Sequence, residues 1–167
     1  MRSIFLGLFF ATAAAASYAQ TKAFNDWNIQ VVDANTLAAY TMNDSGGLFG
    51  KICYVDSQQC VWVLTSSAPC ETDGAYAVLS NSKAGANMHS LTCLPHRQLG
   101  QQLMRFDRFE EVSSIVQRSG KVGFALPIVD GQFRVLRFSL AGSTSATDQL
   151  NELVRSAGDA STKDLSL

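Results

Sequence analysis

The four cysteines limit the folds open to this chain more than any other feature. Cys53, Cys60, Cys70 and Cys93 are an even number, and they follow an N-terminus typical of an export signal, which favours two disulfides. Four cysteines allow three pairings. A zinc site is the alternative interpretation, but the spacing lacks the paired short gaps of such sites, and an oxidising compartment does not keep stable thiolates.

Local geometry favours one of the three pairings. Two apolar runs flank Asp56 and Ser57, which predicts a tight hairpin centred on this pair. That turn sets Cys53 directly opposite Cys60, where the two Cβ atoms are close enough for a bridge. The other two cysteines then close a longer loop, worth about 3 kcal/mol in the chain-entropy model. The favoured bridges are therefore Cys53–Cys60 and Cys70–Cys93.

The first nineteen residues predict a secretory signal peptide. Arg2 gives a positive start, an apolar block and a run of alanines follow, and Ser17-Tyr18-Ala19 places small residues where a signal peptidase binds. The apolar block is too short for a membrane anchor, and no later segment is apolar enough to span a bilayer. The expected organisation is a signal peptide over 1–19, a single β-rich domain over 20–158 and a flexible tail over 159–167. Such a protein is expected to be periplasmic or secreted.

Short apolar runs bounded by turn residues predict about eight strands. Asp130-Gly131 joins the last two, and this dipeptide favours a two-residue hairpin turn because both turn positions need positive φ. Pro127 cannot donate a ladder hydrogen bond, so we expect it at a sheet edge or a bulge. The expected strands cover 27–32, 36–42, 48–55, 60–66, 75–80, 88–94, 121–129 and 132–140, with a loop at 81–86.

Helical spacing of apolar residues predicts two helices late in the chain, near 107–119 and 144–157. Asp107 is expected as an N-cap or first-turn acid of the first, and glycines are expected to end both helices, at Gly120 and Gly158. Ser143 or Thr144 can cap the second. The apolar stripes are Phe109, Val112, Ile115 and Val116 in the first helix and Leu150, Leu153, Val154 and Ala157 in the second. Many strands and few helices predict a mainly β or α+β domain, an antiparallel β-sandwich or a barrel-like sheet.

No motif supplies a catalytic, cofactor-binding or metal site. His89 and His96 lack a recognisable nucleophile or orienting partner, so both are interpreted as structural, His89 as a strand residue that can face solvent and His96 in a surface loop. The 13 basic and 14 acidic residues give a net charge of -1. The basic residues are scattered, so neither nucleic acid nor an anionic membrane is indicated, and a basic patch would require folding to assemble it.

Trp27 and Trp62 each lie in an expected strand among apolar neighbours. Burial in the core is the default interpretation. The alternative is an exposed ring that stacks on a sugar or a peptide, which makes both tryptophans possible ligand contacts.

The segment from Ile115 to Leu150 reads as a helix ending in Gly120-Lys121, a β-hairpin, then Ser-Leu-x-Gly and a final helix. With the early Phe24-x-x-Trp27, this pattern resembles the invasion-associated locus B family, mainly over residues 107–154. The family often has a cysteine shortly after the opening tryptophan, and here there is none between Asn28 and Asp33; the later glycine is followed by Ser143, where an aromatic residue is expected. The resemblance implies an exported β-rich protein of Gram-negative bacteria with no catalytic residues and a link to host colonisation.

We therefore expect a non-enzymatic accessory or binding protein of the bacterial envelope, whose partner is another protein of the envelope or of a host. The alternative is an inhibitor of an extracellular enzyme such as a lysozyme or a protease, with the loop at 66–72 as its inhibitory segment. A third hypothesis is a hydrolase that uses His89 or His96. The sequence specifies neither the ligand nor the oligomeric state.

Overall fold

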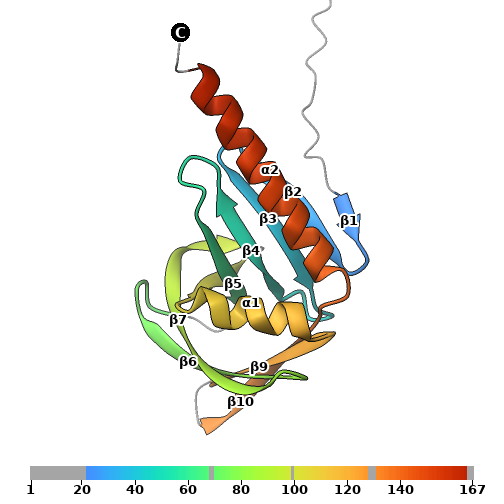
Figure 1. The fold of residues 1–167 in the computed structure, drawn as a ribbon. Coiled ribbons are helices and arrows are strands. Elements are labelled where there is room, and N and C mark those ends of the chain that lie inside the picture. The colour runs from blue at the N-terminus through green and yellow to red at the C-terminus, as the bar shows by residue number, and fades with distance from the viewer. Residues whose placement is uncertain (1–21, 68–69, 99, 128–130, 165–167) are drawn as a thin grey trace, which may run out of the picture.

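The part of the chain that the structure describes forms one antiparallel sheet of ten strands and two helices (Figure 1). The computed structural model describes residues 22–67, 70–98, 100–127 and 131–164, and the expected signal peptide lies outside them. The strands are β1 (Lys22–Phe24), β2 (Trp27–Asp33), β3 (Thr36–Met42), β4 (Leu48–Tyr54), β5 (Cys60–Ser66), β6 (Ala75–Ser82), β7 (Gly85–Gln98), β8 (Gln101–Phe106), β9 (Lys121–Pro127) and β10 (Phe133–Ser139). The helices are α1 (Phe109–Arg118) and α2 (Ser143–Asp164).

The strand order is β1-β2-β3-β4-β5-β8-β7-β6-β9-β10. The sheet is open but curled, because its two ends share one core. The ring of Phe49 in β4 lies 5.1 Å from that of Phe124 in β9 and 5.6 Å from that of Phe138 in β10, measured between centroids. The predicted mainly β, α+β class is confirmed, with ten strands in place of about eight.

Two strands were not predicted from the sequence, and the strand pairing in the β6–β7 and β9–β10 hairpins differs from the expected pairing. β1 and β8 were not expected. β6 and β7 are longer than predicted, and Ser82 pairs with Gly85, so the expected loop at 81–86 is wrong. Phe133 pairs with Pro127, whereas a two-residue turn at 130–131 would pair Pro127 with Arg134. The predicted turn itself lies partly outside the described residues, which do not include Asp130.

α2 lies across β1 to β4, and α1 lies against β5 and β9 (Figure 1). Ala146, Leu150, Val154 and Gly158 of α2 are buried at four-residue intervals, which aims one narrow face at the sheet. Leu153, predicted in this stripe, is 39% exposed.

Gly158 does not end α2, which continues to Asp164. A Cβ atom at Gly158 would lie 2.6 Å from Nε2 of Gln58, in the turn between β4 and β5. The glycine therefore permits a close helix–turn contact instead of acting as a C-terminal stop.

α1 confirms the helix predicted near 107–119, but its ends differ from the prediction. Its N-cap is Arg108, which makes no side-chain capping bond. Asp107 instead accepts a 2.7 Å hydrogen bond from Oγ1 of Thr92 in β7. The helix ends at Arg118, and its C-cap is Ser119, whose backbone is extended, one residue before Gly120.

Both predicted disulfides are present. Cys53 and Cys60 face each other in the β4–β5 ladder, with Cα atoms 4.0 Å apart. Cys70 and Cys93 join the segment after β5 to β7.

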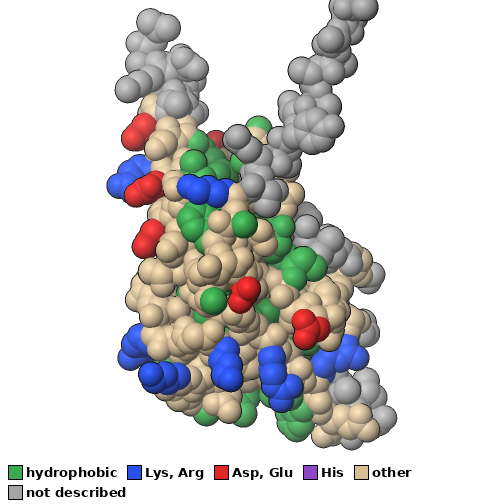
Figure 2. All heavy atoms as spheres, turned by 90° about the vertical axis from the view of Figure 1, so that its right-hand side faces the viewer, with side chains coloured by type: hydrophobic (Ala, Val, Ile, Leu, Met, Phe, Trp, Pro, Cys, Tyr) green, Lys and Arg blue, Asp and Glu red, His purple; other side chains and the backbone are tan. Residues whose placement is uncertain are grey.

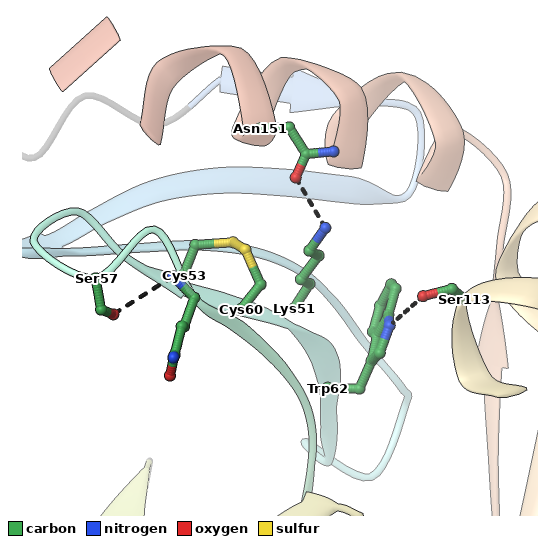
Figure 3. Close-up of a disulfide and its surroundings, with 8 residues drawn as sticks. Lys51, Cys53, Ser57, Cys60, Trp62, Ser113 and Asn151 are labelled. Carbon is green, nitrogen blue, oxygen red and sulfur yellow. Dashed lines mark hydrogen bonds between the residues drawn. A yellow bond between two sulfur atoms is a disulfide. The ribbon is translucent and has the colours of Figure 1, made fainter. Parts of the chain in front are cut away.

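The β4–β5 hairpin that carries the first disulfide is also bonded to both helices (Figure 3). Nζ of Lys51 donates a 2.8 Å hydrogen bond to Oδ1 of Asn151 on α2, and Nε1 of Trp62 donates a 2.9 Å bond to Oγ of Ser113 on α1. Burial lowers the pKa of Lys51, and the nearby carboxylates of Asp148 and Glu110 oppose this shift. This hairpin is therefore one place where the sheet is joined to both helices.

Candidate functional site

A groove of about 880 Å³ runs along β9 on the face of the sheet that the helices leave uncovered. This volume falls within the range of about 300–1,000 Å³ typical of ligand sites. Its lining comes from three adjacent strands and the turns beside them: Leu79, Asn81, Ser82, Lys83, Gly120, Lys121, Val122, Gly123, Ala125, Val135 and Arg137.

The strand register explains the shape of the groove. β9 lies between β6 and β10, and alternate residues of these strands point away from the core. Ala125 of β9 lies between Leu79 of β6 and Val135 of β10. Two residues earlier in β9, Gly123 lies between Asn81 of β6 and Arg137 of β10. At Gly123 and Ala125, β9 contributes only small side chains, so this stretch forms a floor and the larger side chains of β6 and β10 form the walls.

The two ends of the groove differ in chemistry. At the Ala125 end, the wall residues Leu79 and Val135 are 42% and 45% exposed. At the other end, Lys121 lies near Lys83 of the β6–β7 turn and Arg137 of β10. The groove is therefore apolar at one end of β9 and cationic at the other.

No acidic side chain balances these cations within the described part of the lining. The five strands β6 to β10 contain no Asp or Glu, and Asp130, between β9 and β10, lies outside the described residues. Figure 2 shows Lys and Arg side chains gathered across the lower end of the molecule, at the height of β9 and β10 in Figure 1, with most acids above them. The field at this end of the molecule favours an anion.

Sequence patterns did not predict this site, because its residues come from three separated segments. The even scatter of basic residues along the chain hides their convergence. One signal was available in the sequence, since the acids are absent from 75–106 and, Asp130 apart, from 112–147. Segment-by-segment charge counting would have found this asymmetry.

A second polar cluster lies where β6 and β7 pack against α1. Nε2 of His89 is 2.8 Å from Oγ of Ser80, and Nδ1 is 3.4 Å from Oε2 of Glu111. Arg108 donates a 2.8 Å hydrogen bond to the other oxygen of Glu111. His89 is 3% exposed, so the expectation that it faces solvent is wrong. Strand alternation explains its position, because Leu91 and Cys93 point inward as well.

The cluster has the residue types of a hydrolytic relay, but Ser80 has no exposed surface. Burial lowers the pKa of His89, Glu111 opposes the shift and Arg108 adds to it. Nδ1 lacks a hydrogen bond of good geometry to any described residue. In this arrangement burial favours the neutral form of the imidazole, and the Ser80 hydroxyl beside it is not exposed.

Both tryptophans are core residues. Trp27 is 0% exposed and Trp62 is 2% exposed. Their rings pack on Phe49, Trp27 edge-on at 6.0 Å and Trp62 stacked at 5.5 Å. Neither ring presents a face on which a ligand could stack, so the default interpretation applies.

The other candidate sites, His96 and the loop at 66–72, are only partly described by the structure. His96 lies in β7, not in a loop, and its side chain is outside the described part of the chain. In the proposed inhibitory loop, residues 68–69 are likewise not described, and Cys70 is tied to Cys93. Among the described side chains, no group of three or more His, Cys, Asp or Glu could hold a metal ion. None of the described helices has the length and apolarity needed to cross a bilayer.

Solved structures include a protein that is similar in fold to this chain. No protein-family model matches the sequence, and no curated protein matches it. The crystal structure of invasion associated protein b from Bartonella henselae aligns with a TM-score of 0.60, covering 82% of this chain and 99% of that chain. This chain shares its fold.

The sequence identity with invasion associated protein b is 13%, so the likeness concerns the fold alone. It confirms the resemblance drawn from residues 107–154 and extends it over most of the sheet. Because so few residues are shared, the chemistry of the groove depends on this chain's own side chains.

Proposed function

We propose that this protein is an exported, non-enzymatic accessory protein of the bacterial envelope that acts by binding a partner in the groove over β9. The observation that carries the proposal is the groove itself: three cations, Lys83, Lys121 and Arg137, with no acid among the described lining residues. None of the three forms an ion pair with a described residue. Unpaired cations around a concave apolar floor are available for a ligand.

Three further observations support export and a binding role. The two disulfides suit an oxidising compartment. The N-terminal sequence is typical of a signal peptide, and the fold is that of an invasion associated protein. The sealed position of Ser80 beside His89 supports a structural role for this pair.

Site-specific photo-crosslinking in cells tests the proposal. A photoreactive residue at Leu79 should give an adduct of defined mass, and the same residue at Arg105, which is exposed on β8 outside the groove, should not. Lys121→Glu should abolish the Leu79 adduct, whereas Ser80→Ala should leave it unchanged. The mature protein should begin at Gln20 and contain no free thiols. Retention in the cytosol, or equal adducts at both positions, would contradict the proposal.

A further inference from the structure

We infer that the groove over β9 binds a single-chain lipid with a phosphate head group, its alkyl chain lying along the strand and its phosphate between Lys83, Lys121 and Arg137. This inference rests on the proposed binding function and names its ligand class. It follows from the change along β9 from apolar to cationic side chains, from the pairing of the β9 backbone on both sides, and from the three cations that have no acidic partner in the described lining.

The apolar end extends beyond the walls of the groove. Met88 pairs with Leu79, Leu79 with Ala125, and Ala125 with Val135, so these four side chains form one row across β7, β6, β9 and β10. Met88 is 66% exposed, as is Phe133 in the next row. Exposed large apolar side chains gathered on one face mark an interaction site.

The floor suits an alkyl chain better than a peptide. Val122 to Ala125 pair with β6 on one side and with β10 on the other, so the backbone groups of this stretch of β9 are used within the sheet. An extended peptide laid on β9 would find no free ladder donors or acceptors, and its own amides would lack partners. An alkyl chain needs none.

The width also suits one chain. β6 and β10 are second neighbours in the sheet, so their backbones lie about 10 Å apart. Gly123 has no side chain and no positive φ, and a Cβ atom there would meet its nearest atom, Cγ1 of Val135, at 3.8 Å. A Cβ atom there would make ordinary van der Waals contacts with both walls, so backbone geometry does not require the glycine and a larger side chain at this position would fill the trough.

The head-group end favours phosphate. A phosphate monoester carries about -1.5 to -2 charges at pH 7 and three acceptor oxygens. Three cations with no acidic partner match this charge better than they match a single carboxylate, and the planar guanidinium of Arg137 can bind two oxygens at once.

Titration calorimetry with decyl phosphate, below its micellar concentration and on the disulfide-bonded protein, tests the inference. We expect decyl phosphate to bind at one site per chain, with an affinity that falls as salt is added. Decanoate should bind several-fold more weakly, and inorganic phosphate and decyltrimethylammonium should not bind measurably. Equal affinity for the cationic detergent, or for phosphate without the chain, would overturn the inference.

Two pairs of variants locate the site. Gly123→Val fills the trough and Lys121→Glu reverses the charge of the head-group end, and each should weaken decyl phosphate binding about tenfold or more. Ser90→Val and Arg105→Glu make matched changes outside the groove and should bind like the wild type. Thermal melts should show that all four variants are folded. If decyl phosphate does not bind while the Leu79 crosslink still depends on Lys121, the lipid inference fails and the proposed binding function stands.

Discussion

Nε1 of Trp27 donates a 3.0 Å hydrogen bond to the backbone carbonyl oxygen of Ser139. Trp27 begins β2, near one end of the sheet, and Ser139 ends β10, the strand at the other end. The bond therefore links the two ends of an open sheet, 112 residues apart in the sequence. Together with the packing of both sheet ends around Phe49, this hydrogen bond holds the sheet in its curled form. The curl places β9 and β10 below the helices in the view of Figure 1.

Trp27→Phe keeps an aromatic ring in the core but removes this donor. The Ser139 carbonyl then loses this part-buried hydrogen bond, a net contribution of about 0.5–1.5 kcal/mol, and the smaller ring leaves space in a fully buried site, which adds to the loss. We expect the free energy of unfolding to fall by at least about 1 kcal/mol in a urea titration. A loss below about 0.5 kcal/mol would mean that the bond does not hold the sheet ends together.

Leu150→Ala should strongly destabilise the protein, because Leu150 is 0% exposed where α2 packs on the sheet. Removing a buried leucine side chain typically costs about 2–5 kcal/mol. Leu153→Ala is the matched control: it makes the same change one turn away, at a side chain that is 39% exposed, and should cost less than about 1 kcal/mol. Chemical denaturation of both variants checks the prediction, and equal costs would contradict the assigned face of α2.

Acidification should weaken the fold through His89. Burial lowers the pKa of His89 in the folded protein below its ordinary value of 6.5, so the unfolded chain binds more protons as the pH falls through 6.5. The stability that comes from keeping His89 neutral is therefore present above this pH and is lost as the pH falls towards the folded pKa. Glu111, whose pKa is lowered by the Arg108 hydrogen bond, loses its contribution only below its ordinary 4.5.

The comparison of pH 7.5 with pH 5.5 isolates His89 from the carboxylates. Wild-type protein should lose stability between these values, and His89→Gln, which can still hydrogen-bond Ser80, should lose less. Thermal melts at both pH values measure the difference. Identical losses in the two proteins would show that His89 does not titrate with folding.

The two disulfides should contribute unequally. The Cys70–Cys93 bridge spans a sequence separation of 23 and the Cys53–Cys60 bridge one of 7. In the chain-entropy model the longer loop is worth about 1 kcal/mol more. Replacing each pair by alanine and comparing the free energies of unfolding tests this order. A larger loss for the hairpin pair would indicate that packing around Cys53, which is 0% exposed, outweighs loop entropy.

Short sequence patterns correctly predicted the structural features that depend on interactions between near neighbours in the chain. The Asp56-Ser57 turn, the facing cysteines and α1 were recoverable from the sequence, because turn chemistry, strand alternation and helical spacing act over a few residues. The same reasoning failed between β6 and β7, where Ser82 pairs with Gly85 across a stretch that was expected to be a loop. It failed again at Gly158, which looks like a helix stop but serves a close contact with Gln58.

The candidate site could not be predicted in the same way. Lys83, Lys121 and Arg137 belong to a turn and two strands, and they meet only because β9 inserts between β6 and β10. Likewise, Ser80, His89 and Glu111 meet because β6, β7 and α1 pack around one core. The alternation that turns His89 inward was visible in the sequence, but its partners were not.

The sequence by itself determined the hairpin, the cysteine pairing, most strand positions and the two helical segments, since each depends on interactions between near neighbours in the chain. Only the tertiary structure decided the strand order, the buried polar cluster and the groove with its apolar and cationic ends. These depend on which strands pair across long sequence distances, and that choice is made when ten strands and two helices bury one shared core.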